Sequence, residues 1–310
     1  MSLISEKFYG LGTKITLSVN YPFNKEFLKE TNQIIIDFEN RLTVNRKDSE
    51  IMNINDCAGK NSVRVSKSTY ILVKKAVEIS KRNLGFNVAI GPLVKLWKIG
   101  FEGASKPTDD EIKKCLEVIS PQKIMLNDVE HTVFLEQAGM ELDLGGIAKG
   151  YIADQLKVFW KSKGVESGII DLGGNVLLVG TSEHENGIWK IGVQNPLKAR
   201  NVPLGILKLQ DKSVGTSGIY ERKLVVDGNE YHHMLDSKTG YPIKNDLASV
   251  TIISDKSIVG EIWSTIAFYK GIDEGKKLIE AQAGIDAVFI TRDLHIEITS
   301  GLTETFYLNN

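Results

Sequence analysis

The amino-acid sequence predicts an α+β fold in which mixed or antiparallel sheets are packed by helices. Alternating apolar segments of strand length and segments with apolar residues at helical spacing follow one another along the chain. No internal repeat, low-complexity tract or Pro/Ser-rich linker interrupts this pattern. We therefore expect one continuous domain over residues 1–310.

The first two elements follow from the spacing of apolar residues. Residues 14–19 alternate as a strand does, and Phe27, Ile34, Phe38 and Leu42 then recur at helical spacing. A strand followed by an amphipathic helix is therefore expected at the start of the fold.

The next helices are marked by their N-terminal signals. Ser66 is a predicted N-cap, and Glu111 completes a capping-box pattern that begins at Thr108. Short strands are expected within residues 126–144.

A diglycine separates a predicted strand from a predicted helix in the middle of the chain. After Asp143 the strand is expected to pass through Gly145 and Gly146 into a helix, with Lys149 near its start. Such an arrangement exposes a helix N-terminus, which together with a lysine suits a phosphate group. The pattern matches neither the Rossmann nor the P-loop fingerprint.

The second half of the chain is richer in predicted strands. A break at Gly173-Gly174 divides one strand segment, and Asp227-Gly228 predicts a hairpin turn. The remaining strands are expected over residues 167–180, 189–193, 205–209, 224–235, 249–254, 287–291 and 295–299. Helices are expected over residues 258–269 and 274–281.

The composition excludes several classes of protein. The 310 residues are 42% hydrophobic and 25% charged, which excludes fibrous and disordered chains. A net charge of −1 provides no global attraction to nucleic acid or to anionic membranes, so an anionic ligand must be held by a local site. The chain has 28 Gly against only 7 Pro, and Cys57 and Cys115 are expected to be thiols.

The N-terminal residues lack the features of an export signal. They include no basic start with an apolar stretch, and no apolar run approaches the roughly 20 residues of a membrane span. As written, the chain is expected to be cytoplasmic, without a membrane span. The alternative is an extracytoplasmic, membrane-anchored lipoprotein whose leader has been trimmed.

A pair of oxygen side chains on a predicted helix could hold a hard cation. Glu261 and Thr265 are four residues apart and share one helical face, and magnesium suits so sparse a set because it keeps waters. A solvated helix face is the simpler reading of the same pair. His232 and His233 are adjacent in a predicted strand and point to opposite faces, so at most one of them enters a given pocket.

Taken together and in order, these motifs resemble the ApbE family, the FAD:protein FMN transferases. The resemblance runs over nearly the whole chain. The matching stretches are residues 12–13, 48–55, 85–97, 141–154, 171–174, 189–196, 215–222, 233–242 and 264–265.

The resemblance implies a single ApbE-like flavin transferase domain over residues 1–310, with a T-fold-like core. It also implies a Mg²⁺-dependent transferase that splits the FAD pyrophosphate. The enzyme would attach FMN through a phosphoester to a Thr or Ser of an acceptor flavoprotein, releasing AMP, which is a post-translational protein flavinylation.

The family pattern assigns roles to residues of this chain. His233 is the candidate general base, and Asp236 is expected to orient its turn. Cofactor contacts are implied at Leu11, Asn45, Gly85, Phe86, Asn87, Asp143, Lys149 and Leu235. The metal is expected at the carbonyl of Gly146 and the side chains of Glu261, Ser264 and Thr265.

Two positions depart from the family pattern. The family usually has Asp where this chain has Glu261, and a carboxylate near the position of Asn87. These departures keep two alternatives open. One is a metal-dependent FAD pyrophosphatase that gives FMN and AMP, and the other is a non-catalytic FAD-binding protein.

Overall fold

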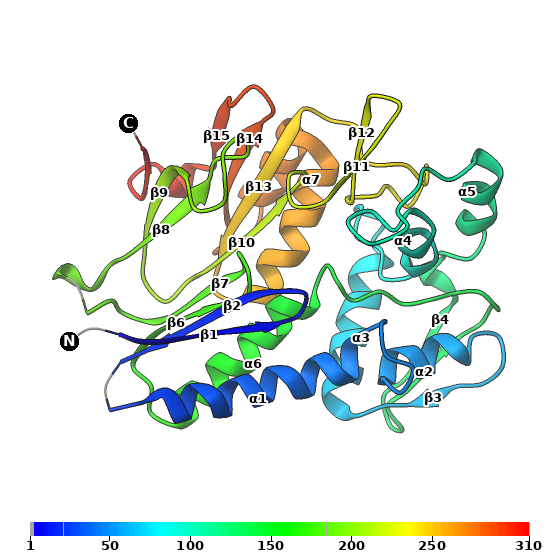
Figure 1. The fold of residues 1–310 in the computed structure, drawn as a ribbon, viewed down its shortest axis with the longest axis horizontal. Coiled ribbons are helices and arrows are strands. Elements are labelled where there is room, and N and C mark those ends of the chain that lie inside the picture. The colour runs from blue at the N-terminus through cyan, green and yellow to red at the C-terminus, as the bar shows by residue number, and fades with distance from the viewer. Residues whose placement is uncertain (1–2, 21, 184, 310) are drawn as a thin grey trace. The chain divides into compact units, whose positions relative to one another are not determined.

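A computed structural model describes residues 3–20, 22–183 and 185–309, and it has an α+β fold (Figure 1). Contacts between residues divide the chain into two compact units. Unit 1 comprises Met1–Glu39, Ile147–Gly218 and Asp246–Asn310, and unit 2 comprises Asn40–Gly146 and Ile219–Asn245. A single domain over residues 1–310 stays a prediction.

Unit 1 is built on an eight-stranded sheet in which every pair of neighbouring strands is antiparallel. In spatial order its strands are β1 (Ile4–Gly10), β2 (Thr13–Val19), β6 (Ser167–Asp171), β7 (Val176–Gly180), β10 (Ser213–Gly218), β13 (Leu247–Ser254), β14 (Asp286–Thr291) and β15 (Ile296–Ile298). A second sheet has the order β16 (Phe306–Leu308), β9 (Pro203–Leu209) and β8 (Trp189–Gln194). The helices are α1 (Lys25–Leu42), α6 (Ala148–Ser162) and α7 (Ser257–Glu280), with short 3₁₀ turns η2 (Glu185–Gly187) and η3 (Ser300–Leu302).

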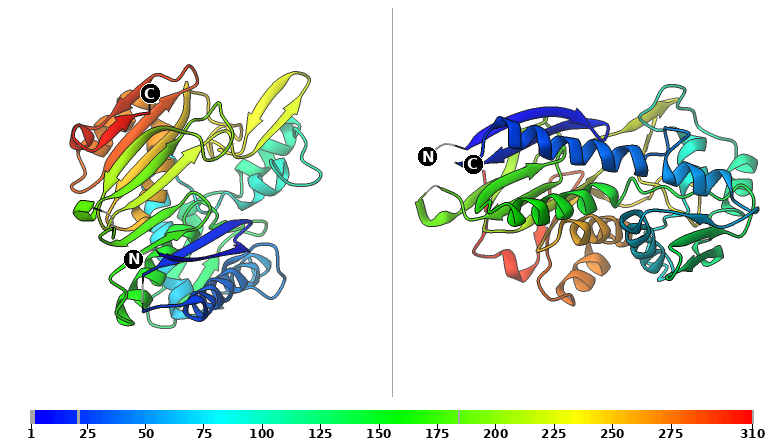
Figure 2. Two further views of the ribbon diagram at one scale, coloured as in Figure 1. Left: turned by 60° about the vertical axis from the view of Figure 1, so that its left-hand side comes forward. Right: turned by 90° about the horizontal axis from the view of Figure 1, so that it is seen from below.

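Both faces of the central strands of this sheet are covered, as the views in Figures 1 and 2 show. All eight residues of β13 are buried. Alternate residues such as Val214 and Ile253 pack with Trp189 and Leu207 of the smaller sheet, and α7 lies against β10 and β13 on the other face. Burial on both faces explains why β13 is apolar or small throughout instead of alternating.

Unit 2 contains four shorter helices and two small sheets. Its helices are α2 (Glu50–Asp56), α3 (Lys67–Ser80), α4 (Gly91–Trp97) and α5 (Asp109–Leu116), with the 3₁₀ turn η1 (Pro121–Lys123). Its strands are β3 (Val63–Arg64), β5 (Thr132–Leu135) and β4 (Ile124–Asn127) in one antiparallel sheet, and the hairpin β11 (Lys223–Val226) and β12 (Asn229–His232). Trp97 is fully buried in a core cluster of this unit and donates its indole N–H to the carbonyl of Gly240.

The predicted helix starts and hairpin turn are confirmed. Helix α3 begins directly after Ser66, although the Ser66 hydroxyl bonds Glu50 and not the helix backbone. The capping box between Thr108 and Glu111 is formed in both directions. The hairpin turn at Asp227-Gly228 has positive φ at both residues, 50° and 76°, as a type I′ turn requires.

The strand predicted immediately before the diglycine is wrong. Residues 142–144 belong to no strand. The N–H of Asp143 donates to the carbonyl of Val88 at 2.9 Å, and both backbone groups of Leu142 bond the side chain of Asn55. Its Oδ1 accepts the N–H of Leu142 at 2.7 Å, and its Nδ2 donates to the carbonyl of Leu142 at 3.1 Å. The backbone is therefore satisfied without a sheet.

Other elements also differ from the prediction, and helices α2 and α4 are among those that were not expected. Strand β1 was not predicted, and it forms the edge of the large sheet. The two helices expected at residues 258–269 and 274–281 are parts of one element, α7, which is kinked at Gly271 with φ 76° and ψ −177°.

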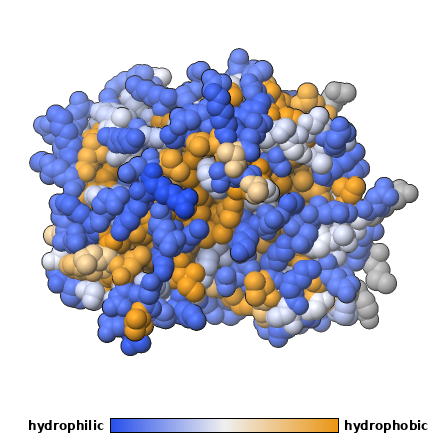
Figure 3. Space-filling model, turned by 180° about the vertical axis from the view of Figure 1, so that it is seen from behind, coloured by the Kyte–Doolittle hydropathy of each residue, from blue (hydrophilic) through white to orange (hydrophobic). Residues whose placement is uncertain are grey.

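The structure also describes membrane-spanning potential, the surface and the two cysteines. In the described part of the chain, no helix combines the length and apolarity that a membrane crossing requires. On the face drawn in Figure 3, patches of hydrophobic side chains are bordered by hydrophilic ones. Cys57 and Cys115 are free thiols, and burial raises the pKa of Cys115.

Candidate active site

Helix α7 of unit 1 carries a carboxylate that contacts the backbone of α6. The N–H of Gly150, in the first turn of α6, donates to Oε2 of Glu261 at 2.7 Å. The two helices touch here, because a Cβ on Gly150 would lie 2.6 Å from the carbonyl oxygen of Ser257. Only glycine allows this approach, so the Gly150 position is needed for the contact between Glu261 and α6.

Glu261 is strongly perturbed by its surroundings. Burial of its carboxyl raises its pKa from 4.5 to about 7, against the opposing effects of the Gly150 N–H and the positive charge of Lys149. The Asn175 amide also lowers this pKa, although its Nδ2 does not meet standard hydrogen-bond geometry. A carboxylate withdrawn from water with incomplete compensation is what a bound cation would stabilise.

The two predicted hydroxyl ligands on α7 differ in their contacts. Ser264 is buried; its hydroxyl lies 2.8 Å from that of Ser217 and donates to the carbonyl of Glu261 at 3.1 Å. Within the described residues the Thr265 hydroxyl makes no hydrogen bond. All three α7 side chains offer oxygen atoms of the type that Mg²⁺ prefers, and the Ser264 hydroxyl differs in being already hydrogen-bonded.

The fourth predicted ligand, Gly146, is an exposed residue of unit 2. Its carbonyl would be a further oxygen donor, so the predicted set consists entirely of oxygen atoms and fits a hard cation. No group of three or more His, Cys, Asp or Glu side chains gathers as a metal site in the described ranges.

Two residues that the sequence analysis missed hold α7 in place. Asp154 of α6 accepts the N–H groups of Ser257 and Ile258 at 2.7 and 3.0 Å, which satisfies the N-terminus of α7. The Ser257 hydroxyl donates to Oδ1 of Asn175 at 2.6 Å. Burial raises the pKa of Asp154, and its two hydrogen bonds oppose that rise. Asp154 is the last residue of the matching stretch 141–154. Its place in that stretch is the signal in the sequence that could have identified it.

Leu11 of unit 1 occupies the turn between β1 and β2. Its φ is 53° and that of Gly12 is 69°, and its N–H donates to Oε1 of Glu39 at 3.0 Å. A branched residue in this left-handed region is strained. Lys149, the other predicted cofactor contact in this unit, lies in the first turn of α6.

The loop between α3 and α4 of unit 2 contains three predicted cofactor residues. Gly85 has φ 110°, a conformation that favours glycine. Phe86 is buried with its ring beside Gly146. Asn87 donates to the carbonyl of Ile119 at 2.9 Å and accepts the N–H of Ala89 at 2.9 Å, so its side chain fixes the loop.

Asp143 lies at the start of the diglycine turn of unit 2. Its Oδ1 accepts the N–H of Gly145 at 2.7 Å. Burial raises its pKa, while the Gly145 N–H and the positive charges of Arg222 and Lys95 lower it. Arg222 was not among the predicted residues, yet it is electrostatically coupled to one of them.

The two adjacent histidines have different surroundings, although strand β12 ends at His232 and does not include His233. His232 is buried, with Nε2 3.0 Å from the carbonyl of Ile243. His233 is partly exposed, and both its N–H and its Nδ1 lie 3.3 Å from the carbonyl of Arg222. Of the two, His233 is the more exposed.

Asp236 organises the turn that follows His233. Its Oδ1 accepts the N–H of Lys238 at 2.8 Å, and its backbone bonds Tyr241 and Gly240. These bonds fix the turn over residues 236–241, and the orienting role of Asp236 toward His233 stays a prediction.

Leu235 and Asn45 are the last two predicted cofactor contacts of unit 2. Leu235 is 7% exposed in the core cluster around Trp97, so its side chain serves packing. Asn45 precedes α2, and its N–H bonds the hydroxyl of Thr43 at 3.1 Å.

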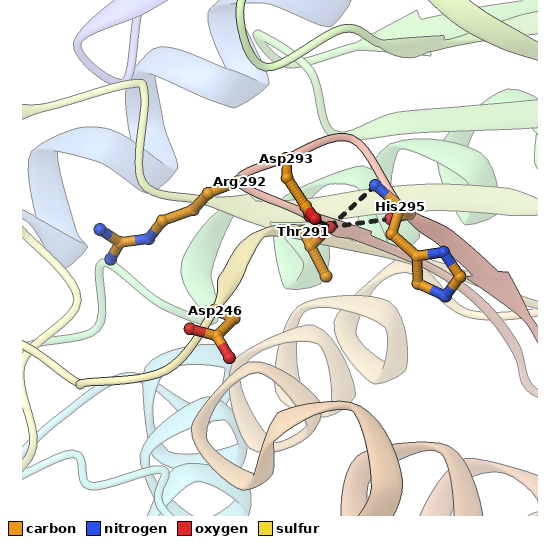
Figure 4. A pocket seen from close by; sticks show the side chains of 5 residues that line it. All are labelled: Asp246, Thr291, Arg292, Asp293 and His295. Carbon is orange, nitrogen blue, oxygen red and sulfur yellow. Dashed lines mark hydrogen bonds between the residues drawn. The ribbon is translucent and has the colours of Figure 1, made fainter.

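A cavity of about 380 Å³ lies elsewhere in unit 1, at the turn between β14 and β15. Figure 4 shows the residues that line it: Asp246, Thr291, Arg292, Asp293 and His295. None of the predicted site residues is among them.

The raised pKa of Glu261 predicts how the stability of the metal-free protein depends on pH. The folded state binds this proton more tightly than the unfolded state, so the stabilisation is complete below about pH 4.5 and is lost as the pH rises to about 7. The loss is about 3 kcal/mol in the free energy of unfolding. We expect urea unfolding with a chelator to show it, and Glu261→Gln to remove it.

The exposed Glu304 provides the matched control, because Glu304→Gln should leave the pH dependence unchanged. Excess Mg²⁺ should reduce the dependence, since a cation favours the charged carboxylate. An equal slope in wild type and Glu261→Gln would contradict the prediction.

Comparison with known proteins bears on the whole chain. The ApbE family model matches residues 11–289. A relative from Klebsiella pneumoniae (strain 342), named FAD:protein FMN transferase, is 42% identical over 94% of this chain and 90% of its own. A relative of the same name from Treponema pallidum (strain Nichols) is 34% identical over 89% of this chain and 80% of its own.

Solved structures agree with these sequence matches. A crystal structure of the ApbE protein of Thermotoga maritima has a TM-score of 0.89 at 27% identity, covering 97% of this chain and 98% of that chain. The flavin transferase ApbE from Vibrio cholerae has a TM-score of 0.84 at 25% identity, with 98% and 99% covered. From its sequence and its fold alike, the chain belongs to the ApbE family.

Proposed function

We propose that the protein is a FAD:protein FMN transferase that attaches FMN through a phosphoester to a Thr or Ser of an acceptor flavoprotein. The observation that carries this proposal is the desolvated carboxylate of Glu261, held on the first turn of α6 and one helical turn from the Thr265 hydroxyl. Relatives that match nearly the whole chain bear the name of this activity.

The reaction exchanges one phosphoryl bond for another. The hydroxyl oxygen of the acceptor forms a new bond to the phosphorus on the FMN side of FAD. The bond from that phosphorus to the bridging oxygen breaks, and AMP leaves with this oxygen. The hydroxyl proton passes to His233, the candidate general base.

The residues of the chain divide the remaining tasks. Glu261 and Thr265, with the carbonyl of Gly146 and Ser264, would hold Mg²⁺, which supplies neutralisation of phosphate charge when it is bound. Lys149 and the N-terminus of α6 suit a phosphate group. The proposed cofactor contacts are Leu11, Asn45, Gly85, Phe86, Asn87, Asp143, Lys149 and Leu235.

A mass-spectrometric transfer assay tests the proposal. The protein is incubated with FAD, Mg²⁺ and a flavoprotein domain that offers a Thr in its flavinylation site. We expect the mass of one FMN to be added to this domain, and a chelator to abolish the addition. Replacing the acceptor Thr by Val is the matched control and should prevent the addition.

The same assay separates the two alternative functions. Free FMN and AMP, formed at a rate that does not change when the acceptor is added, would identify a pyrophosphatase. FAD that is bound but not consumed would identify a non-catalytic flavin-binding protein. Either result would overturn the proposed transferase.

A further inference from the structure

The side chain of Arg222 packs against two residues of unit 2, Gly100 and Phe101, which together form its seat. The guanidinium carbon lies 4.8 Å from the ring centroid of Phe101. The aliphatic part of the side chain crosses Gly100, where a Cβ would lie 2.7 Å from Cδ of Arg222. Gly100 also has φ 85°, so glycine is favoured there on two counts.

The charge of Arg222 is not neutralised by a close partner. In the described ranges no carboxylate lies within ion-pair distance of its guanidinium, and the residue is partly exposed. Nearby Lys95, by contrast, is paired with Glu141 at 2.6 Å. A guanidinium remains protonated and offers N–H donors in a planar fork that matches phosphate oxygens. Stacking on Phe101 orients the group while leaving those donors free.

Arg222 also connects two of the predicted site stretches. Its carbonyl oxygen receives the N–H of His233, with Nδ1 of the same residue also 3.3 Å away. Its positive charge acts on Asp143 at the diglycine turn. The residue that carries this cation therefore contacts the candidate base through its main chain, and the cation acts on the carboxylate that begins the diglycine turn.

We propose that Arg222, seated on Gly100 and Phe101, binds a phosphate oxygen of the flavin dinucleotide and so selects phosphorylated flavins over riboflavin. The proposal rests on the proposed function for the identity of the ligand. The guanidinium would balance charge on the transferred phosphoryl group, and the main chain of Arg222 contacts His233, which receives the proton in the proposed reaction.

Equilibrium titration with FAD and with riboflavin tests this role. Arg222→Gln is expected to weaken FAD binding about 10- to 100-fold, the effect of losing one charge-assisted hydrogen-bonding group. Riboflavin binding should stay within about twofold of wild type, because riboflavin has no phosphate. Arg222→Lys should recover part of the FAD affinity, since it restores a point charge without the planar fork.

Lys223 offers a matched control. It is the next residue, carries the same charge and is exposed in an ion pair with Glu230. Lys223→Gln should leave both titrations unchanged. Gly100→Ala keeps the arginine but obstructs its seat, so it should weaken FAD binding in the same direction as Arg222→Gln.

The outcomes separate this proposal from the proposed function. Unchanged FAD affinity in Arg222→Gln, or an equal loss of riboflavin affinity with a lowered unfolding midpoint, would overturn the role of Arg222. Wild-type protein that binds FAD but does not transfer FMN would overturn only the transferase. Wild-type protein that does not bind FAD would overturn both.

Discussion

His233→Ala is expected to lower FMN transfer by about 10²–10⁴-fold while FAD binding is largely kept. The carbonyl of Arg222 can only accept a hydrogen bond, so the contact at 3.3 Å places the proton of the imidazole on Nδ1. Nε2 then retains the lone pair that would accept the proton of the acceptor hydroxyl. Single-turnover transfer and FAD titration measure the two effects separately.

The exposed His295 provides the control for this substitution, because it lines the separate cavity of Figure 4. His295→Ala should transfer FMN at the wild-type rate. His233→Ala with unchanged transfer would remove His233 from the role of general base.

Gly150→Ala is expected to destabilise the protein by about 1–3 kcal/mol and to lower transfer more than FAD binding. The added Cβ would lie 2.6 Å from the carbonyl oxygen of Ser257 and 2.7 Å from Cα of Ile258, both backbone atoms that cannot rotate away. The helices α6 and α7 must then separate, which weakens the bond from Gly150 to Glu261. A misplacement on the order of 1 Å can cost about 10²-fold in rate.

Gly215→Ala is the matched control, because Gly215 lies on β10, which also packs against α7. A Cβ at Gly215 would lie 3.5 Å from the backbone carbon of Gly260, an ordinary contact distance. Urea unfolding and transfer assays on both variants should show a loss only for Gly150→Ala. Equal stability of the two variants would contradict the close helix contact inferred here.

Local signals in the sequence predicted much of the fold. The cap at Thr108 and the turn at Asp227-Gly228 each depend on residues within a few positions of one another. Such short-range patterns are independent of the rest of the chain. The strand expected before Gly145 failed for the opposite reason, since Asn55, 87 residues away from Leu142, supplies its hydrogen bonds.

The family motifs include Asp154 and Arg222, but they did not indicate what these two residues contact. Asp154 caps a helix whose first turn lies 104 residues further along the chain, and no spacing rule links the two. Arg222 is seated by Gly100 and Phe101, far from it in sequence.

The sequence by itself thus determined the α+β class, most of the elements and the family to which the chain belongs, because periodicity, caps and ordered motifs are local properties. Only the tertiary structure decided that Glu261 is withdrawn from water on the backbone of Gly150 and that Arg222 has no carboxylate partner among the described residues. Desolvation and charge pairing depend on which distant segments pack together, and packing is a property of the folded chain.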